Sequence, residues 1–221
     1  MQQFNTLWRS RFVTKRVSGF RAGIMILMLT ASCTFLTLSP QIASASSRPA
    51  VVPGNMEGIG GDFTLNSANG PVALHDFLGK VVLLYFGYTH CPDACPTTLT
   101  HWRIAFNSLS PHKQAQVRGI FVSIDPGRDS TELLKDYVNH FHHNIVGVTG
   151  SSSELQKVTA EYKASFSYEK TDNSDGANYT VNHSGAVYVI DPTGQVRDLL
   201  TFQSSSEEIV NSIRTALRVG Y

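Results

Sequence analysis

The apolar run at residues 81–86 (VVLLYF) is the feature that most constrains the fold of this chain. A run this short, rich in β-branched and aromatic side chains, is typical of a strand that is buried on both faces of a sheet. Gly87 ends the run, and Pro96 lies where the first turn of a helix tolerates proline. The sequence therefore predicts a central strand that leads directly into a helix from about residue 96 to about residue 109.

Strands and helices alternate along the rest of this region. Asn69-Gly70 between β-rich runs at 63–65 and 72–74 predicts an N-terminal hairpin. Beyond the first helix we expect strand 117–124, helix 130–141, strand 145–148, helix 152–164, a hairpin of strands 186–190 and 195–202, and a last helix over 205–219. This alternation predicts an α/β fold with a mixed central sheet, which has parallel members and is flanked by helices.

Charge divides the chain into two unlike parts. No acidic residue precedes Glu57, whereas six of the 18 Lys and Arg residues do, which leaves 12 basic against 17 acidic residues from Glu57 onward. A domain with a net negative charge gives a polyanion no electrostatic reason to bind. We therefore exclude nucleic acid as a partner.

The acid-free N-terminus has the layout of an export signal. Its basic start leads into an apolar stretch at 22–38 and then into Ala43-Ser44-Ala45, a small-residue cleavage site. The stretch is near the lower length limit for crossing a bilayer of roughly 30 Å, so a retained anchor is the second interpretation. Lipidation of Cys33 is a third, which the Thr at position 30 disfavours.

These observations divide the chain into residues 1–45, a signal peptide or N-terminal membrane anchor, residues 46–61, a flexible tether rich in Ser, Pro and Gly, and residues 62–221, the folded domain. Signal and anchor both place the domain on the periplasmic side of a bacterial inner membrane. The mitochondrial inner membrane is the less favoured location, because little room for a presequence precedes the apolar stretch.

Cys91 and Cys95 lie four residues apart where the central strand gives way to the helix. At a helix start two such thiols can face the same way, and the partial positive charge there favours thiolate, which binds metal or attacks disulfides. Two cysteines and one imidazole suit three-coordinate Cu(I), whereas a closed zinc site takes four protein ligands. A structural disulfide is the alternative, although a domain of about 160 residues can bury an adequate core without one.

The chain resembles the Sco/SenC copper chaperones of cytochrome c oxidase assembly over about residues 57–219. The resemblance rests on residues 85–96 (YFGYTHCPDACP), 123–129 (SIDPGRD) and 179–183 (YTVNH) before an apolar strand that ends in 191–194 (DPTG). It implies a thioredoxin-like fold and a site in which Cys91, Cys95 and His183 hold one copper ion, as Cu(I) and also as Cu(II). The family commonly has Asp where this chain has Asn182, which leaves the histidine ligand in place.

Other candidate residues carry weaker signals. The resemblance implies that Asp125 lies near the copper site, where it contacts a metal ligand or a partner protein. The alternative is structural: Asp125-Pro126 is also typical of a turn, and Asp129 or Ser130 of a helix N-cap. His90 adjoins Cys91 but its backbone position directs it away from the thiols. A helix end explains His140, His142 and His143 as well as a metal site does.

Two functions follow from the same residues. The first is a non-enzymatic metallochaperone that delivers copper to the copper-centre subunit of cytochrome c oxidase, with other periplasmic copper carriers or thiol reductants as further partners and the membrane contacted through the N-terminal segment. The alternative is a thiol-disulfide oxidoreductase that acts on the cysteines of the oxidase copper centre. Three residues between the cysteines, where the usual redox motif has two, favour the first.

Overall fold

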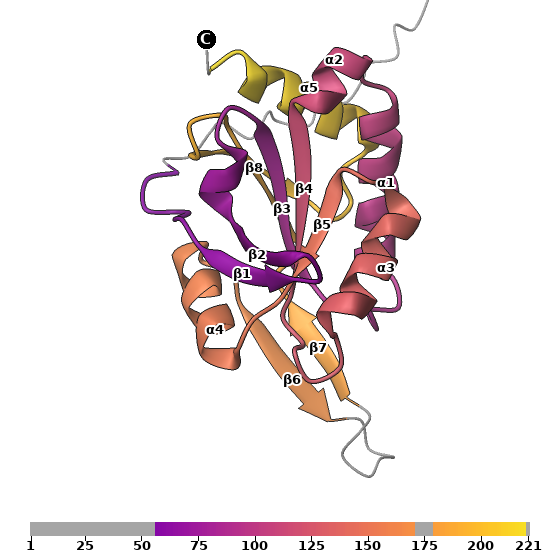
Figure 1. Ribbon diagram of the computed structural model, residues 1–221, viewed down its shortest axis with the longest axis vertical. Helices are drawn as coiled ribbons and strands as arrows, with labels where there is room; N and C mark the ends of the chain where they lie inside the picture. Colours follow the sequence, from indigo (N-terminus) through magenta and orange to yellow (C-terminus); the bar gives the residue numbers. More distant parts are fainter. Residues whose placement is uncertain (1–55, 171–178, 220–221) are drawn as a thin grey trace, which may run out of the picture. The chain divides into compact units, whose positions relative to one another are not determined.

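The computed structural model describes residues 56–170 and 179–219, which carry a five-stranded mixed sheet with helices on both faces (Figure 1). The predicted signal or anchor and most of the predicted tether lie outside these residues. Within the described part of the chain, no helix combines the length and the hydropathy needed to cross a membrane.

The central strand of the sheet is β3 (Val81–Gly87), as the apolar run predicts. It pairs in parallel with β4 (Val117–Ser123) and antiparallel with β8 (Ala186–Ile190). Two further strands, β5 (Ile145–Val148) and β9 (Val196–Thr201), complete the order β5-β4-β3-β8-β9. The predicted mixed sheet is thereby confirmed.

The two faces of the sheet bury two separate apolar cores. On one face the odd-numbered side chains of β3 pack against α1 (Ala94–Asn107), α3 (Thr131–Phe141) and α5 (Ser206–Leu217). The even-numbered side chains pack on the other face against α4 (Ser152–Glu161) and the N-terminal hairpin. Period-two alternation with apolar residues at every position makes β3 a strand that is buried on both sides.

The N-terminal hairpin consists of β1 (Thr64–Ser67) and β2 (Gly70–Ala73), joined at Asn69-Gly70 as predicted. A short 3₁₀ helix, η1 (Leu74–Phe77), follows it where the sequence suggested more strand. The described end of the predicted tether lies against the domain, because Ile59 packs on the second core and the Gly60 amide donates to Glu161 O.

Three elements are absent from the sequence-based assignment. A short helix, α2 (Pro111–Ala115), precedes β4, and a two-stranded sheet consists of β6 (Phe166–Lys170) and β7 (Tyr179–His183). Figure 1 shows this β6–β7 hairpin extending from one end of the five-stranded sheet. The β6–β7 hairpin matters most for function, because its last residue is His183.

Candidate metal centre

The two thiols lie at the junction that the sequence predicts. β3 ends at Gly87, Cys91 lies half-buried in the connecting loop, and Cys95 is completely buried in the first turn of α1. The helix begins at Ala94, so Pro96 is its third residue and not its first. The Cys95 amide donates to the Cys91 sulfur over 3.5 Å, which places Cys91 against the positive end of the helix.

His183 reaches the same point from the end of β7, 88 residues away in the sequence. Its Nε2 lies 3.7 Å from Cys95 Sγ, and its Nδ1 lies 3.2 Å from the carbonyl oxygen of Ser184. If Nδ1 carries the proton and donates it to that carbonyl, the Nε2 lone pair is free to bind a metal ion. The rings of Tyr85 and Tyr88 pack edge to face against the imidazole, at interplanar angles of 74° and 90°.

The ligand atoms of Cys91, Cys95 and His183 lie within 4.8 Å of one another. A metal held at about 2.0–2.3 Å from each nitrogen or sulfur allows at most about 4.6 Å between two ligand atoms, so slight side-chain movements would bring all three into contact with it. Among the described residues, no other group of three or more His, Cys, Asp or Glu side chains brings its possible ligand atoms this close together. Two soft sulfurs and one imidazole favour Cu(I) over the hard, oxygen-seeking cations.

The two thiols differ strongly in acidity. Hydrogen bonds from the Cys95 thiol, from His183 and from backbone amides lower the pKa of Cys91 to about 3, although burial opposes the shift. The pKa of Cys95 is raised, because its proton is donated to Cys91 and because the side chain is buried. These contacts favour the thiolate form at Cys91 and the thiol form at Cys95.

Gly87 makes room for this arrangement. A Cβ at this position would lie 2.7 Å from Cys95 Sγ and 2.8 Å from the ring of Phe121. Both distances are shorter than carbon and sulfur atoms tolerate, so any side chain here would displace the thiol. The close approach of β3 to the start of α1 explains the glycine in the motif.

Asp125 anchors the β6–β7 hairpin. Its buried carboxylate accepts hydrogen bonds from the Tyr179 hydroxyl and from Arg128 Nε, each over 2.5 Å. Arg128 in turn donates to the carbonyl oxygen of Tyr179 over 2.9 Å, and its guanidinium stacks on the Tyr179 ring. The hydrogen bonds of the Asp125 carboxylate thus lead to the strand that presents His183 and not to the thiols themselves.

Asp129 has a role that the sequence does not reveal. The N-cap of α3 is Ser130, whose hydroxyl accepts from the Leu133 amide. Asp129 is buried and instead accepts from the amide and hydroxyl of Thr89, over 2.9 and 2.6 Å, and from the Ser123 hydroxyl over 2.6 Å. Because Thr89 is two residues before Cys91, this carboxylate fixes the loop that carries the first thiol.

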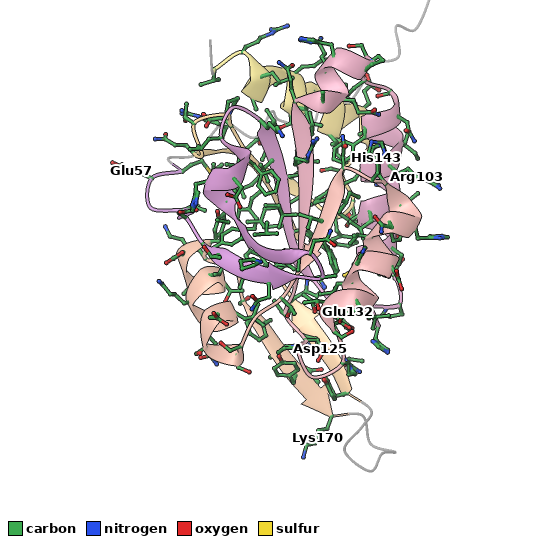
Figure 2. The ribbon with its side chains drawn as sticks, viewed as in Figure 1. Glu57, Arg103, Asp125, Glu132, His143 and Lys170 are labelled. Carbon is green, nitrogen blue, oxygen red and sulfur yellow. The ribbon has the colours of Figure 1, made fainter. Side chains whose placement is uncertain are left out.

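The remaining histidines stay outside the candidate site. His90 is half-exposed beside Thr89 and Asp129, in agreement with its predicted direction away from the thiols. His142 is buried, accepts from the Asn144 amide and stacks on His143, so its contacts are those of a helix end. Figure 2 shows Asp125 at the end of the sheet where the β6–β7 hairpin lies and His143 farther along the molecule.

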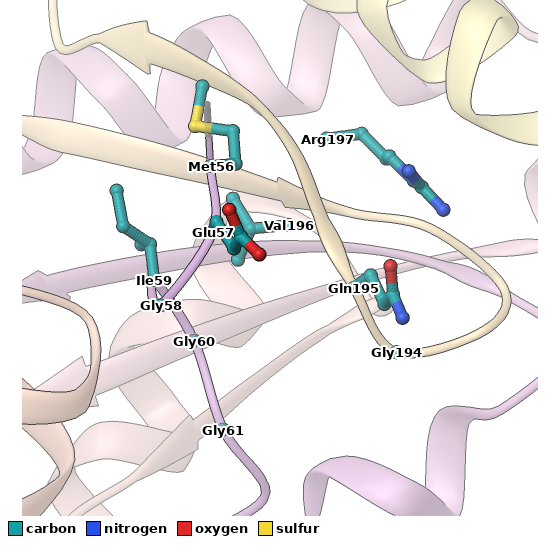
Figure 3. Close-up of a pocket in the computed structure, with 10 residues that line it drawn as sticks. All are labelled: Met56, Glu57, Gly58, Ile59, Gly60, Gly61, Gly194, Gln195, Val196 and Arg197. Carbon is teal, nitrogen blue, oxygen red and sulfur yellow. The ribbon is translucent and has the colours of Figure 1, made fainter. Parts of the chain in front are cut away.

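One cavity of the described part of the chain lies away from the thiols. It has a volume of about 500 Å³ and is open to solvent between residues 56–61 and 194–197 (Figure 3). Arg197, one of its lining residues, is already paired with Asp191. No cluster of nucleophilic or metal-ligating side chains lines it, so the thiol site is the stronger candidate.

Comparison with known proteins agrees with this geometry. The family model described as SCO1/SenC matches residues 52–218. A SCO2-like protein of Rickettsia felis is 37% identical over 157 residues, which cover 71% of this chain and 76% of the relative. The mitochondrial Protein SCO2 of Saccharomyces cerevisiae is 32% identical over 95% of this chain and 70% of the yeast protein. The crystal structure of Arabidopsis thaliana ScoI with copper bound superposes with a TM-score of 0.66 at 30% identity, over 73% of this chain and 99% of that one.

Proposed function

The chain belongs to the SCO1/SenC family, and on that premise we propose that it is a copper metallochaperone, which binds one copper ion through Cys91, Cys95 and His183 and delivers it to cytochrome c oxidase during assembly. The observation that carries the proposal is the convergence of two sulfurs and one imidazole nitrogen within 4.8 Å. The Arabidopsis relative, which holds copper in its crystal structure, supports the choice of metal.

The asymmetry of the thiols suits a site that must release its cargo. Cys91 is half-exposed and already a thiolate, so it can take up Cu(I) without losing a proton. Cys95 is buried and releases its proton when the metal binds. An incoming cysteine of the copper-centre subunit can reach the exposed side first, so that ligands exchange one at a time and the copper is never free.

The alternative is a thiol-disulfide oxidoreductase that acts on the cysteines of the oxidase copper centre. One observation favours it, namely that a low-pKa, accessible thiolate beside a buried thiol is the arrangement of an attacking and a resolving cysteine. His183 discriminates between the two functions, because a reductase has no need of a third metal ligand.

The experiment that tests the proposal is anaerobic Cu(I) loading of the full chain, followed by competition with a Cu(I) chelator. We expect one copper per chain, and we expect His183→Ala to weaken retention by more than about tenfold, since even outer contacts of metal ligands are often worth 10–100-fold. His90→Ala is the matched control, because His90 lies in the same motif but outside the ligand set. A wild-type chain that gives up its copper as readily as His183→Ala would leave the reductase as the better account.

The location is part of the same proposal. We propose that residues 1–45 export the domain to the periplasmic side of a bacterial inner membrane, either as a cleaved signal or as a retained anchor. A reporter fused after Tyr221 should be active only outside the cytoplasm. Release of soluble protein that begins at Ser46 would identify a cleaved signal, and a reporter active in the cytoplasm would contradict export.

A further inference from the structure

The hydroxyl of Tyr85 is buried next to the thiol pair and has no hydrogen-bond partner among the described residues. Tyr85 lies on β3, two residues before Gly87, so both residues face α1. A buried hydroxyl without a partner destabilises a fold, and phenylalanine would fill the same space without that cost. A hydroxyl in this position is therefore expected to find its acceptor in another state of the site.

The surroundings of Tyr85 indicate which atom that acceptor is. Its ring centroid lies 5.7 Å from that of His183, and His183 Nε2 is 3.7 Å from Cys95 Sγ. The Cβ direction of Gly87, on the same face of β3, leads to Cys95 Sγ at 2.7 Å. Thr98 and Cys95 are the side chains whose polar atoms lie next to the Tyr85 hydroxyl.

A sulfur that coordinates a metal ion is a thiolate, which accepts hydrogen bonds more strongly than a neutral thiol does. In the loaded protein the Tyr85 hydroxyl would therefore have a strong acceptor beside it.

We propose that Tyr85 Oη donates a hydrogen bond to the metal-bound thiolate of Cys95, and that this bond shifts the preference of the site toward Cu(I) over Cu(II). The proposal rests on the copper-binding function proposed above. A hydrogen bond to a coordinating sulfur withdraws electron density from it, and Cu(II) depends on that density more than Cu(I) does. Tyr85 is accordingly a positioning and tuning residue, because it acts through Cys95 and does not contact the metal.

The chain offers a matched control in Tyr137. The Tyr137 hydroxyl is also buried and also lacks a partner among the described residues. Its ring packs against Phe121 with centroids 5.6 Å apart, as the ring of Tyr85 does at 6.3 Å, and Phe121 is the contact that the two tyrosines share. Tyr137→Phe therefore removes a comparable hydroxyl from the same core without removing the donor beside Cys95.

The test compares Tyr85→Phe with Tyr137→Phe and the wild type in the full chain, using copper as the probe. The first readout is the thermal midpoint of the metal-free protein, which both variants should leave unchanged or raise. The second is the thiolate-to-Cu(II) charge-transfer band together with the Cu(II)/Cu(I) midpoint potential. For Tyr85→Phe alone we expect the band to move to lower energy and the potential to fall, with the Cu(I) to Cu(II) affinity ratio reduced by about two- to tenfold, the range of one hydrogen bond.

Each other outcome overturns a stated part of the account. A band and potential equal to those of the wild type would remove Tyr85 from the tuning of copper. A lower thermal midpoint of metal-free Tyr85→Phe with unchanged spectra would assign its hydroxyl a structural acceptor, and Thr98, whose hydroxyl donates to Ala94 O over 2.8 Å, would be the first candidate. A wild-type chain that retains no copper would overturn the proposed function itself, and the role of Tyr85 with it.

Discussion

At the scale of single residues, Cys91 and Cys95 lie only four positions apart in the sequence, yet their thiols differ strongly in pKa. Donated hydrogen bonds lower the pKa of Cys91 to about 3, and the pKa of Cys95 is raised. Because the pKa of Cys91 is lower in the folded chain than in the unfolded chain, where it is about 8.5, its thiolate stabilises the fold above that pH. This stabilisation is lost only as the pH falls toward the pKa of the folded chain. Between pH 4 and pH 8 Cys91 should therefore remain ionised.

Alkylation by iodoacetamide measures this state directly, because only a thiolate reacts. We expect the rate at Cys91 to change by less than about tenfold between pH 8 and pH 5, whereas an ordinary thiol would lose about tenfold per pH unit. Mass spectrometry of the digested protein assigns the modified cysteine, and Cys91→Ser is the control. A rate at Cys91 that follows the ordinary thiol profile would show that the hydrogen bonds to its sulfur are not formed in solution.

Gly87 provides the second residue-scale prediction. Gly87→Ala would place a methyl group 2.7 Å from Cys95 Sγ, so we expect a loss of about 1–3 kcal/mol of stability from overpacking together with weaker copper retention. Gly127→Ala is the control, since its new Cβ would meet the nearest atom, Tyr179 Oη, at an ordinary 3.5 Å. Chelator competition and thermal unfolding of both variants check the prediction, and a Gly87→Ala protein that behaves like Gly127→Ala would contradict it.

At the scale of elements, the β6–β7 hairpin depends on the ion pair between buried Asp125 and partly buried Arg128. Removing one partner of a buried pair commonly costs about 3–5 kcal/mol, because the other charge is left without compensation. We expect Asp125→Ala to lose stability in this range and also to weaken copper retention, since the strand that carries His183 loses its anchor.

Asp191→Ala is the matched control for that change. Asp191 is equally buried and accepts from Arg197 Nε over 2.5 Å, but it lies at the turn between β8 and β9 and contacts nothing at the thiols. Its loss should lower the thermal midpoint without changing copper affinity. If Asp125→Ala also left copper affinity unchanged, Asp125 would be a turn residue of structural importance only.

The elements also show where sequence reasoning reaches its limit. The apolar run of β3, the Asn69-Gly70 turn and the apolar strands β4, β5 and β8 carry periodicity strong enough to predict the sheet. The motifs predict which residues converge at the candidate metal centre. The β6–β7 hairpin gives no such signal, because β6 is largely exposed and its polar side chains resemble those of a loop. Tyr85 and Asp129 give no signal for another reason: the side chains around them lie on other elements and become neighbours only in the folded chain.

At the scale of the whole molecule, the candidate metal centre is a product of the tertiary fold. The cysteines come from the junction of β3 and α1, and His183 comes from a hairpin that the loop after β4 anchors. The site lies beyond the carboxyl end of β3, where ligands of α/β sheets commonly bind. Because the three ligands converge only in the native state, copper should stabilise the fold by mass action.

The same geometry couples metal binding to oxidation of the molecule. A disulfide between Cys91 and Cys95 would remove two of the three ligands at once, so we expect oxidised protein to be nearly free of copper and a dithiol reductant to restore uptake. Bound copper should in turn protect both thiols from oxidation. Copper content measured before and after reduction checks this, and disulfide-bonded protein that binds copper as tightly as reduced protein would place the ligands elsewhere, with His140, His142 and His143 as the first candidates.

X-ray absorption at the copper edge of the Cu(I)-loaded full chain tests the central claim most directly. The account predicts a three-coordinate Cu(I) ion with two sulfur neighbours at about 2.3 Å and one imidazole nitrogen at about 2.0 Å, and loss of the nitrogen in His183→Ala. A spectrum with sulfur neighbours alone, or one that His183→Ala leaves unchanged, would contradict a metal centre made of Cys91, Cys95 and His183.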